Sequence, residues 1–535
     1  MTVPASDPAV AAEAAAAARA FAALVWGAAQ AALLACAGHR ALLLWSWWRG
    51  ARRAPAAPPP PPAEWPRVTV QLPVYNERRV ATRLLDAVAA FDYPRDRLEV
   101  QVLDDSTDET RDLVAAAAAR HRRAGLDVTV RRRRRRTGYK AGALAAGLRT
   151  ARGELVAVFD ADFVPPSDFL RRVVPHFSDP RVGMVQARWG HLNRDANELT
   201  RAQAAMLDAH FNLEHAVRQA RGLFFNFNGT AGVWRRACIK DAGGWSHDTL
   251  TEDLDLSYRA QLRGWRFVYE PAVVVPAELP ADLAAFRAQQ RRWARGSIQT
   301  ARKLLPAVLA APLPARVRLE ACAHLTAHAV HPLLIVLTVL LPSVMGVPTA
   351  LPAAAAWALQ AAVLGLGVAP VALFLWAGQR AAGVGVWAAA RGAAAAIVLG
   401  AGMSLHLSRA VLAGLAGRTG EFERTPKTGA GAAHAPTPAY RPPRAAAGRG
   451  ELALALYAAA LGAAAWHGGE WRTVPFTALL SAGFLAVGLG ALRAVNGAGR
   501  ACAAVAPAAG AGRRAPAAGR SPAFAPRRAR GVTGG

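Results

Sequence analysis

Long apolar segments near both ends of the chain constrain its fold more than any other feature. The first, Ala20–Trp48, is interrupted mainly by His39 and Arg40. About 20 apolar residues span the hydrocarbon core of a bilayer. This run is longer than the apolar core of a secretory signal peptide and shows no small-residue cleavage site, so we predict a retained transmembrane helix. Tryptophans end it and arginines follow, which by the positive-inside rule predicts a cytoplasmic segment next: Trp45, Trp47, Trp48, Arg49, Arg52 and Arg53.

Apolar segments return after Arg318. Ala321–Met345 and Leu351–Trp376 predict two membrane spans joined by a short Gly/Pro turn. Leu452–Trp466 and Val474–Leu492 predict a second hairpin, whose first helix is short. The chain is therefore expected to be a multi-pass protein of the cell (plasma or inner) membrane.

Residues 383–417, between these hairpins, are apolar but contain Arg391. The loop 418–449 and the tail after Arg493 are both basic, so both are expected in the cytoplasm. The segment before the loop should then make no net crossing, and we predict an interfacial or re-entrant helix. The tail from Ala501, rich in Ala, Gly, Pro and Arg, is expected to be disordered.

The charge of the chain suggests an anionic partner. Its 64 Lys and Arg against 36 Asp and Glu give a net charge of +28, which suits nucleic acid, an acidic membrane face or a phosphorylated substrate. Part of it lies in Arg131–Arg136. Because nothing else supplies stacking aromatics or a reader helix, we interpret this run as an exposed loop facing anionic lipid or solvent, and expect no nucleic-acid partner. The four cysteines lie far apart, which disfavours a zinc cluster or a disulfide scaffold.

Residues 68 to about 303 have the pattern of an α/β domain. Short apolar runs that end in acidic or polar residues occur in VTVQLPVYNE, LEVQVLDDS and ELVAVFDADF, and helical stretches are predicted over 79–91 and 108–123. Alternating strands and helices predict a parallel sheet, with functional groups at the carboxyl ends of the strands. All three acidic clusters fall at such ends.

Two pairs of carboxylates stand at these strand ends. Asp160 and Asp162 could hold Mg²⁺ or Mn²⁺ together with a diphosphate, because both ions prefer hard oxygen ligands; a polar loop start is the alternative. Asp104 and Asp105 repel each other, so a sugar hydroxyl, a base edge or a metal would explain them. Capping of the next helix is the alternative for this second cluster.

Three further groups could act on a phosphorylated sugar. Lys140, between glycines in GYKAG, could reach phosphate oxygens, or could simply lie on the surface. The cluster TEDLD at 251–255 could supply a general base, although N-capping by Thr251 explains it as well. QQRRW at 289–293 could stack a sugar and clamp a diphosphate, or lie on the membrane surface in an amphipathic helix.

Taken in order, the motifs QLPVYNE, VLDDSTDET, YKAGAL, FDADF, FNFNGTAGVWRR, TEDLDLSYR and QQRRW closely resemble those of the processive family 2 glycosyltransferases. This family includes cellulose and hyaluronan synthases, and the chain is most similar to the plant cellulose-synthase-like mannan and glucomannan synthases. The resemblance is continuous from residue 68 to about 300, and EFERTPK at 421–427 resembles a cytoplasmic loop of these enzymes. The R-x-x-x-R … D-x-S-x-x-G signature of a cyclic-di-GMP sensor is missing, so that form of control is not expected.

The resemblance implies an α/β GT-A domain, a nucleotide-diphospho-sugar transferase fold, embedded in an α-helical transmembrane protein. It implies that Asp253 is the catalytic base and that Asp160 and Asp162 bind Mg²⁺ or Mn²⁺. The other implied site residues bind substrate: Asn76, Glu77, Asp104, Asp105 and Lys140 on the nucleotide and diphosphate side, Asn228, Gly229 and Thr230 along the acceptor site, and Gln289, Arg292 and Trp293 near the acceptor end and the diphosphate.

Seven segments are expected along the chain. They are an N-terminal transmembrane helix with its flank (1–53), a Pro/Ala-rich linker (54–66), a cytoplasmic GT-A domain (67–303), an interface helix with transmembrane helices (304–416), a cytoplasmic basic loop (417–449), a C-terminal transmembrane hairpin (450–495) and a disordered basic tail (496–535).

The predicted activity is inverting transfer of a sugar from UDP-glucose or GDP-mannose onto a growing β-linked polysaccharide, with membrane lipids as further partners. The alternative is a non-processive enzyme that adds one sugar to a lipid acceptor. A non-enzymatic scaffold is disfavoured, because the acidic residues at the strand ends form a complete set.

Overall fold

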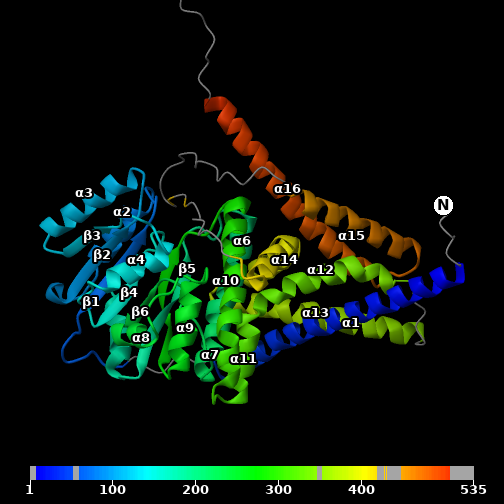
Figure 1. Cartoon of the computed structure of the whole chain (residues 1–535), viewed down its shortest axis with the longest axis horizontal. Coiled ribbons are helices and arrows are strands. Elements are labelled where there is room, and N and C mark those ends of the chain that lie inside the picture. Colours follow the sequence, from blue (N-terminus) through cyan, green and yellow to red (C-terminus); the bar gives the residue numbers. More distant parts are fainter. Residues whose placement is uncertain are drawn as a thin grey trace, which may run out of the picture.

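The computed structural model describes residues 8–51, 59–345, 352–418, 427, 429 and 448–505. The strands gather at one end of the molecule and the long apolar helices at the other (Figure 1). Parts of the predicted linker, most of the predicted basic loop with EFERTPK except Lys427, and the tail beyond 505 lie outside the described residues.

Within the described residues, seven strands form one mixed sheet in the order β3-β2-β1-β4-β6-β5-β7. They are β1 (Val68–Val74), β2 (Leu98–Asp104), β3 (Asp127–Arg132), β4 (Leu155–Val158), β5 (Val182–His191), β6 (Gly232–Arg235) and β7 (Arg266–Ala277). The three strands predicted from sequence are β1, β2 and β4, and their parallel pairing is confirmed. β6 runs antiparallel to both β4 and β5, which the sequence pattern did not reveal.

Helices cover both faces of this sheet. Alternate residues of β4 enter two different cores, because successive side chains of a strand point to opposite faces: Leu155 and Ala157 join one core, Val156 and Val158 the other. The helices of this part are α2 (Ala81–Ala89), α3 (Thr110–Arg123), α4 (Tyr139–Leu148), α5 (Phe169–Val173), α8 (Arg236–Asp241) and α9 (Glu252–Leu262). The helices predicted over 79–91 and 108–123 correspond to α2 and α3.

A second group of helices lies between the sheet and the long apolar helices (Figure 1). It consists of α6 (Glu198–Ala209), the π-helix η4 (His210–His215), α7 (Ala216–Ala220), α10 (Leu283–Ala310) and α11 (Ala315–Leu325). Ion pairs tie the first long helix, α1 (Pro8–Ser46), to this group: Arg40 pairs with Glu214 of η4, and His39 Nε2 lies 2.8 Å from Glu320 Oε2 of α11.

The remaining long helices are α12 (Val330–Leu340), α13 (Ala353–Ala381), α14 (Val386–Leu415), α15 (Arg449–His467) and α16 (Val474–Val505). In the described part of the chain, four stretches are long and apolar enough to cross a membrane: Ala9–Gly50, Ala361–Ala381, Val386–Leu415 and Val474–Ala494. A fifth candidate combines α11 and α12, which meet at a bend of 50°. α15 falls short of this test among the described helices, as its short apolar run suggested, and α16 extends past the predicted end at Leu492.

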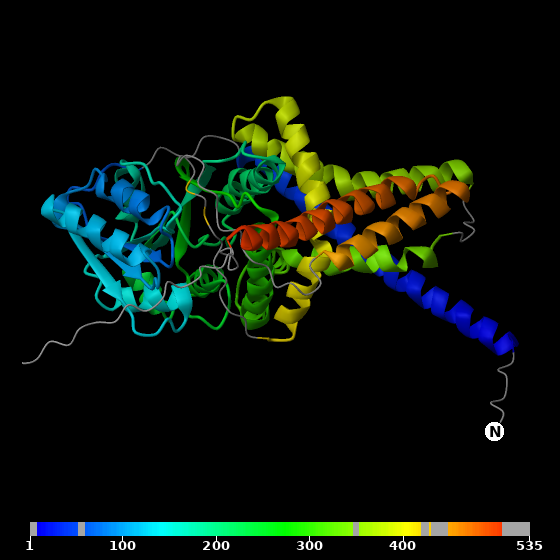
Figure 2. The same ribbon diagram turned by 90° about the horizontal axis from the view of Figure 1, so that it is seen from above.

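The position of α14 bears on the predicted interfacial helix. Its first half packs against α6 through Ala393 and Ala396, and its second half packs against α10 through Met403 and Leu407. Figure 2 shows α14 running across the direction of α15 and α16. α14 also packs against the apolar helices α12, α13 and α16, and it is itself long and apolar enough to span a membrane. The interfacial or re-entrant helix therefore stays a prediction.

Candidate active site

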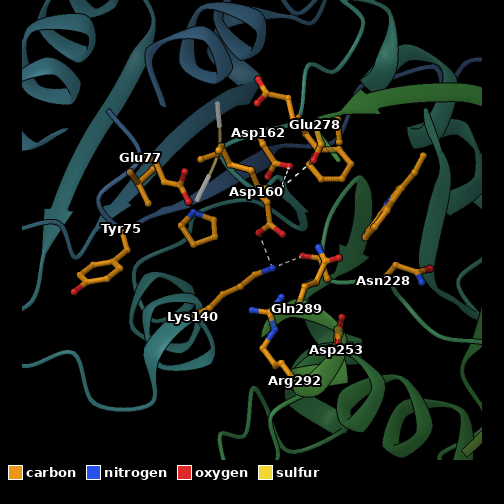
Figure 3. A pocket seen from close by; sticks show the side chains of 18 of the residues that line it. Tyr75, Glu77, Lys140, Asp160, Asp162, Asn228, Asp253, Glu278, Gln289 and Arg292 are labelled. Carbon is orange, nitrogen blue, oxygen red and sulfur yellow. Dashed lines mark hydrogen bonds and ion pairs between the residues drawn. The ribbon is translucent and has the colours of Figure 1, made fainter. Parts of the chain in front are cut away.

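The loops after β1, β2 and β4 meet at one edge of the sheet and line a pocket of about 170 Å³. The parallel register explains this, because Val74 at the end of β1 lies opposite Asp104, and Val158 at the end of β4 lies opposite Gln71. Most predicted site residues line the pocket (Figure 3): Glu77, Asp105, Lys140, Asp160, Asp162, Asn228, Gly229, Asp253, Gln289, Arg292 and Trp293. The other three, Asn76, Asp104 and Thr230, do not line it.

Asp160 and Asp162 follow β4, and each is paired with a lysine. Lys140 Nζ lies 2.6 Å from Asp160 Oδ1, and Lys427 Nζ lies 2.6 Å from Asp162 Oδ2. The backbone N–H of Asp160 donates to Thr230 Oγ1 at 2.9 Å, which fixes the turn. Two hard carboxylate groups that already attract cations fit a divalent ion shared with a diphosphate. No cluster of three or more His, Cys, Asp or Glu suited to a metal occurs among the described residues. Oxygen atoms of a bound diphosphate or of water would therefore complete the ligand set of such an ion.

Lys140 stands at the start of α4 and points toward these carboxylates (Figure 3). Its Nζ donates to the carbonyl oxygen of Gly229 at 2.8 Å and lies 3.8 Å from Glu252 Oε1. Burial disfavours the charged ammonium, but the carboxylates of Asp160 and Glu252 outweigh burial and raise the pKa of Lys140. The side chain is therefore a fixed positive charge inside the pocket, and the alternative of a plain surface lysine is wrong.

Asp253 lies half-buried in the first turn of α9. Burial and the neighbouring carboxylate of Glu252 raise the pKa of Asp253 to about 7, against the opposing effect of Lys140. A carboxyl group with a pKa near neutrality suits a general base. Thr251 precedes the helix but makes no side-chain capping bond, and its hydroxyl lies 3.2 Å from Thr300 Oγ1 of α10 instead. Capping by Thr251 therefore does not explain the acidic cluster.

α10 carries Gln289, Arg292 and Trp293 to the pocket. The helix begins at an N-cap, where the backbone N–H of Ala285 donates to Asp282 Oδ1 at 2.8 Å. It then passes so close to the loop before α9 that a Cβ at Gly296 would lie 2.5 Å from Thr251 Cγ2. Glycine therefore sets the separation between α10 and the loop that carries Asp253.

The arginine run differs from its predicted role as a loop facing lipid or solvent. Arg132 is opposite Asp104 in the β2–β3 register, and its Nε donates to Asp104 Oδ2 at 2.9 Å. Arg133 donates from Nε to Asp105 Oδ1 at 3.0 Å and makes a second, shorter bond through Nη2. Both carboxylates are therefore neutralised by arginines at or just after the end of the next strand. Arg132, Arg134 and Arg135 are the exposed members of the run.

Asn76 and Asp104 have supporting positions. The backbone N–H of Thr107 donates to Asn76 Oδ1 at 2.8 Å, and the backbone N–H of Asn76 donates to Ser106 Oγ at 2.9 Å. These bonds join the loop after β1 to the loop after β2. Asp104 is buried and accepts from the backbone N–H of Ser106 at 3.0 Å, so it shapes the same loop.

Tyr75 and Glu278 also line the pocket, although neither was predicted from the sequence to have a role. Tyr75 lies beneath Arg136, whose guanidinium carbon is 3.5 Å from the centre of the ring. Glu278 follows β7, and its buried carboxylate lies 2.8 Å from Arg83 Nη2. Tyr75 adjoins Asn76 in the VYNE motif, which could have suggested it. The contacts of Arg136 and Glu278 depend on the three-dimensional fold, and no local pattern marks them.

A larger cavity of about 860 Å³ adjoins this pocket and extends between α1, α12, α13 and α14. Seven residues line both spaces: Trp189, Leu207, Asn228, Thr251, Asp253, Gln289 and Trp293. The predicted base and part of the Q-x-x-R-W motif therefore stand where the pocket at the sheet edge meets the space among the apolar helices.

Residues 66–296 match a family model described as glycosyltransferase like family 2. This segment is a family 2 glycosyltransferase domain. Glucomannan 4-beta-mannosyltransferase 1 of Oryza sativa subsp. japonica is 46% identical over 248 residues, which make up 45% of this chain and 47% of that protein. Glucomannan 4-beta-mannosyltransferase 2 of Arabidopsis thaliana is 45% identical over 248 residues, 45% of this chain and 46% of that protein. The matched segment thus spans about half the length of these relatives.

Most of the chain also resembles a solved structure. A mannosyltransferase of Pyrobaculum calidifontis, in complex with GDP-Man and Mn²⁺, is 27% identical with a TM-score of 0.50, and the match covers 74% of this chain and 100% of that chain. The GT-A fold and the resemblance to cellulose-synthase-like family 2 enzymes are confirmed for the glycosyltransferase domain by these comparisons and the mixed sheet.

Proposed function

We propose that the chain is a membrane-bound inverting glycosyltransferase that moves a hexose from a nucleotide sugar to a hydroxyl of a β-linked polysaccharide. The observation that carries this proposal is the position of Asp253, which lines both the pocket of acidic strand ends and the cavity among the apolar helices. A donor in the pocket and a long acceptor in the cavity would meet at this carboxylate.

The negatively charged diphosphate of the donor would be bound by basic side chains and by a metal cation. Lys140 and Arg292 line the pocket and would attract the diphosphate, while Tyr75 and Glu77 line its β1 end, where the nucleoside would lie. A divalent cation, Mg²⁺ or Mn²⁺, held by Asp160 and Asp162 would offset the charge that develops on the leaving diphosphate. The named relatives are mannosyltransferases and the solved neighbour holds GDP-Man, so GDP-mannose is the donor we favour over UDP-glucose.

Transfer then requires one proton acceptor at the acceptor side. Asp253 would take the proton of the attacking hydroxyl, and its raised pKa makes it a stronger base than an ordinary aspartate. Lys140 would stay charged, since the surrounding carboxylates raise its pKa. Trp293 lines both spaces and offers an apolar ring face on which a sugar can stack.

The proposed sugar transfer also implies how the protein is arranged in the membrane. We place the glycosyltransferase domain on the cytoplasmic side, where nucleotide sugars are available, and the apolar helices in the cell membrane with lipids around them. The cavity between these helices would then lead the growing polymer away from the pocket.

A donor panel on purified membranes tests this proposal. We expect GDP-mannose, and less well UDP-glucose, to yield a polymer whose linkage analysis shows β-linked hexose. A product that carries a single sugar on a lipid would favour the non-processive alternative instead. Release of nucleoside diphosphate without sugar transfer to either acceptor would contradict both readings.

A further inference from the structure

Two histidines lie side by side on the π-helix η4 between α6 and α7. His210 and His215 have ring centres 4.4 Å apart. Residues five apart in an α-helix of 3.6 residues per turn point about 140° away from each other. A π-helical turn closes its hydrogen bonds between residues five apart and thus brings the two rings to one side, and such segments are frequent at functional sites. The irregular helix is therefore what pairs these side chains.

The amide of Asn228 lies against both rings. His210 Nε2 is 3.0 Å from Asn228 Nδ2, and His215 Nε2 is 2.7 Å from Asn228 Oδ1. The backbone N–H of Asn228 also donates to Gln186 Oε1 at 2.9 Å. The loop position and the side-chain rotation of this asparagine are therefore both fixed.

The direction of these hydrogen bonds follows from a carboxylate. Glu214 Oε2 lies 2.9 Å from His210 Nδ1, and although burial opposes ionisation, Arg40 and Arg218 hold the pKa of Glu214 well below its usual range. The carboxylate can only accept, so Nδ1 of His210 donates and its Nε2 accepts from Asn228. His215 Nε2 then donates to Asn228 Oδ1.

The opposite arrangement, in which His215 Nε2 accepts a hydrogen bond from Asn228, is disfavoured by burial. It would require an N–H on Nδ1 of His215, an atom that is buried and has no hydrogen-bond partner in the described part of the chain. A buried donor without an acceptor is costly. Burial also keeps the pKa of His215 well below its usual range, so this ring stays neutral.

Asn228 stands beside the reacting groups. It lines both the pocket and the larger cavity, and a Cβ at the next residue, Gly229, would lie 2.8 Å from Asp253 Oδ2. With one N–H and one lone pair used by the histidines, the amide keeps one donor and one lone pair. A sugar hydroxyl, which both donates and accepts hydrogen bonds, matches this free N–H and this free lone pair.

We propose that His210 and His215 are positioning residues that lock the Asn228 amide so that it orients the acceptor hydroxyl toward Asp253. The inference rests on the proposed sugar transfer and adds a link to the membrane: Arg40 of α1 pairs with Glu214, which binds His210. Three polar contacts thus join Arg40 of the first apolar helix to Asn228 through Glu214 and His210.

The test separates acceptor use from donor use in the full-length protein in membranes. His215→Phe removes the N–H but keeps an aromatic ring among Phe211, Phe225 and Tyr269, which surround it. We expect kcat/KM for a β-linked oligosaccharide acceptor to fall at least about tenfold. The KM for the nucleotide sugar, its hydrolysis by water and the melting temperature should stay unchanged.

Three comparisons make the outcome decisive. His215→Gln keeps an N–H near the same position and should restore most of the acceptor kcat/KM. The double variant His215→Phe/Asn228→Ala should be no slower than Asn228→Ala alone, because both changes remove one function. The control His176→Phe breaks a histidine–carboxylate contact of 3.0 Å with Glu270, outside both cavities, and should leave the acceptor kcat/KM at the wild-type value.

Equal losses of transfer and hydrolysis in His215→Phe, or additive effects in the double variant, would overturn the positioning role. So would wild-type acceptor kinetics in His215→Phe. A wild-type protein that hydrolyses the donor but transfers no sugar would contradict the proposed function instead, so the two failures are distinguishable.

Discussion

At the scale of single residues, Asp253 carries the proposed chemistry and gives the first prediction. Asp253→Asn removes the proton acceptor, and general-base help is worth about 10²–10⁴ in rate, so we expect kcat to fall by about that factor with donor affinity nearly unchanged. Initial rates and donor binding on the same membranes measure this. Asp248→Asn is a suitable control, because Asp248 is exposed, contacts Ser246 and Lys303, and lines neither cavity. Near wild-type turnover in Asp253→Asn would assign the base elsewhere.

Asp255 is no substitute for that control. Its side chain is fully buried and paired with Arg259 at 2.6 Å and Lys303 at 2.8 Å. Removing one partner of a buried ion pair destabilises the fold strongly. A loss of activity in Asp255→Asn would therefore report unfolding, which a melting curve reveals.

The second prediction concerns pH. A base acts only when deprotonated, and burial with Glu252 raises the pKa of Asp253 to about 7. The rate of transfer should therefore rise with pH up to about 7, level off above it, and fall about tenfold for each unit below. A rate that stays flat from pH 5 to 8 would contradict the assignment of Asp253 as the base.

The third prediction concerns the metal. Because Asp160 and Asp162 are proposed to hold the cation, Asp162→Asn and excess EDTA should each abolish transfer, and added Mn²⁺ or Mg²⁺ should restore only the EDTA-treated wild type. Isothermal titration of Mn²⁺ with donor present gives an independent readout. Asp168→Asn, at an exposed carboxylate near Arg172, serves as control. Full activity in excess chelator would refute the metal assignment.

At the scale of secondary-structure elements, the approach of α10 to the loop before α9 gives the fourth prediction. In a free helix, Gly→Ala stabilises by about 1 kcal/mol. Gly296→Ala should instead push α10 away from Thr251, because the added Cβ would lie 2.5 Å from its Cγ2. We expect at least a tenfold loss of transfer. Gly27→Ala in α1, where a Cβ meets nothing within 4 Å, should leave transfer unchanged. Unaltered activity in Gly296→Ala would show that the spacing does not matter.

The elements also show why part of the site was predictable. Acidic residues that end apolar runs are expected to meet at one sheet edge, so Asp160, Asp162 and Asp105 were found from pattern alone. Their partners were not. Whether Arg132 and Arg133 reach the carboxylates depends on the register of β3 against β2, and the six identical side chains carry no register signal.

At the scale of the whole molecule, the proposed topology gives the fifth prediction. Reporters fused near Arg123 and in the tail after Val505 should both read as cytoplasmic, and one in the turn near Gly469 should read as external. Cysteine labelling from outside intact cells provides a second measurement. An external reading near Arg123 would overturn the placement of the glycosyltransferase domain. Opposite readings at Arg123 and the tail would mean either that α14 crosses the membrane or that α15 does not.

Hydropathy located the apolar segments but not their arrangement. The predicted span Ala321–Met345 is a broken helix, bent by 50° where α11 meets α12. The amino-acid composition of this segment does not indicate such a bend. The path of α14 depends on small residues that let α6 approach, such as Ala393 and Ala396, and these also suit a membrane span. A helix must be long and apolar to cross a membrane, but its packing against other helices decides whether it does.

The ion pairs between α1 and the neighbouring helices impose an order on biosynthesis. Arg40 must wait for Glu214, 174 residues later, and His39 for Glu320, 281 residues later. At about 5–20 residues per second, the ribosome needs roughly 14–56 s to make that last partner. Until then Arg40 and His39 of α1 lack these partners. The rate of translation therefore limits when α1 can pack against η4 and α11. This packing is complete only after the whole glycosyltransferase domain has been synthesised.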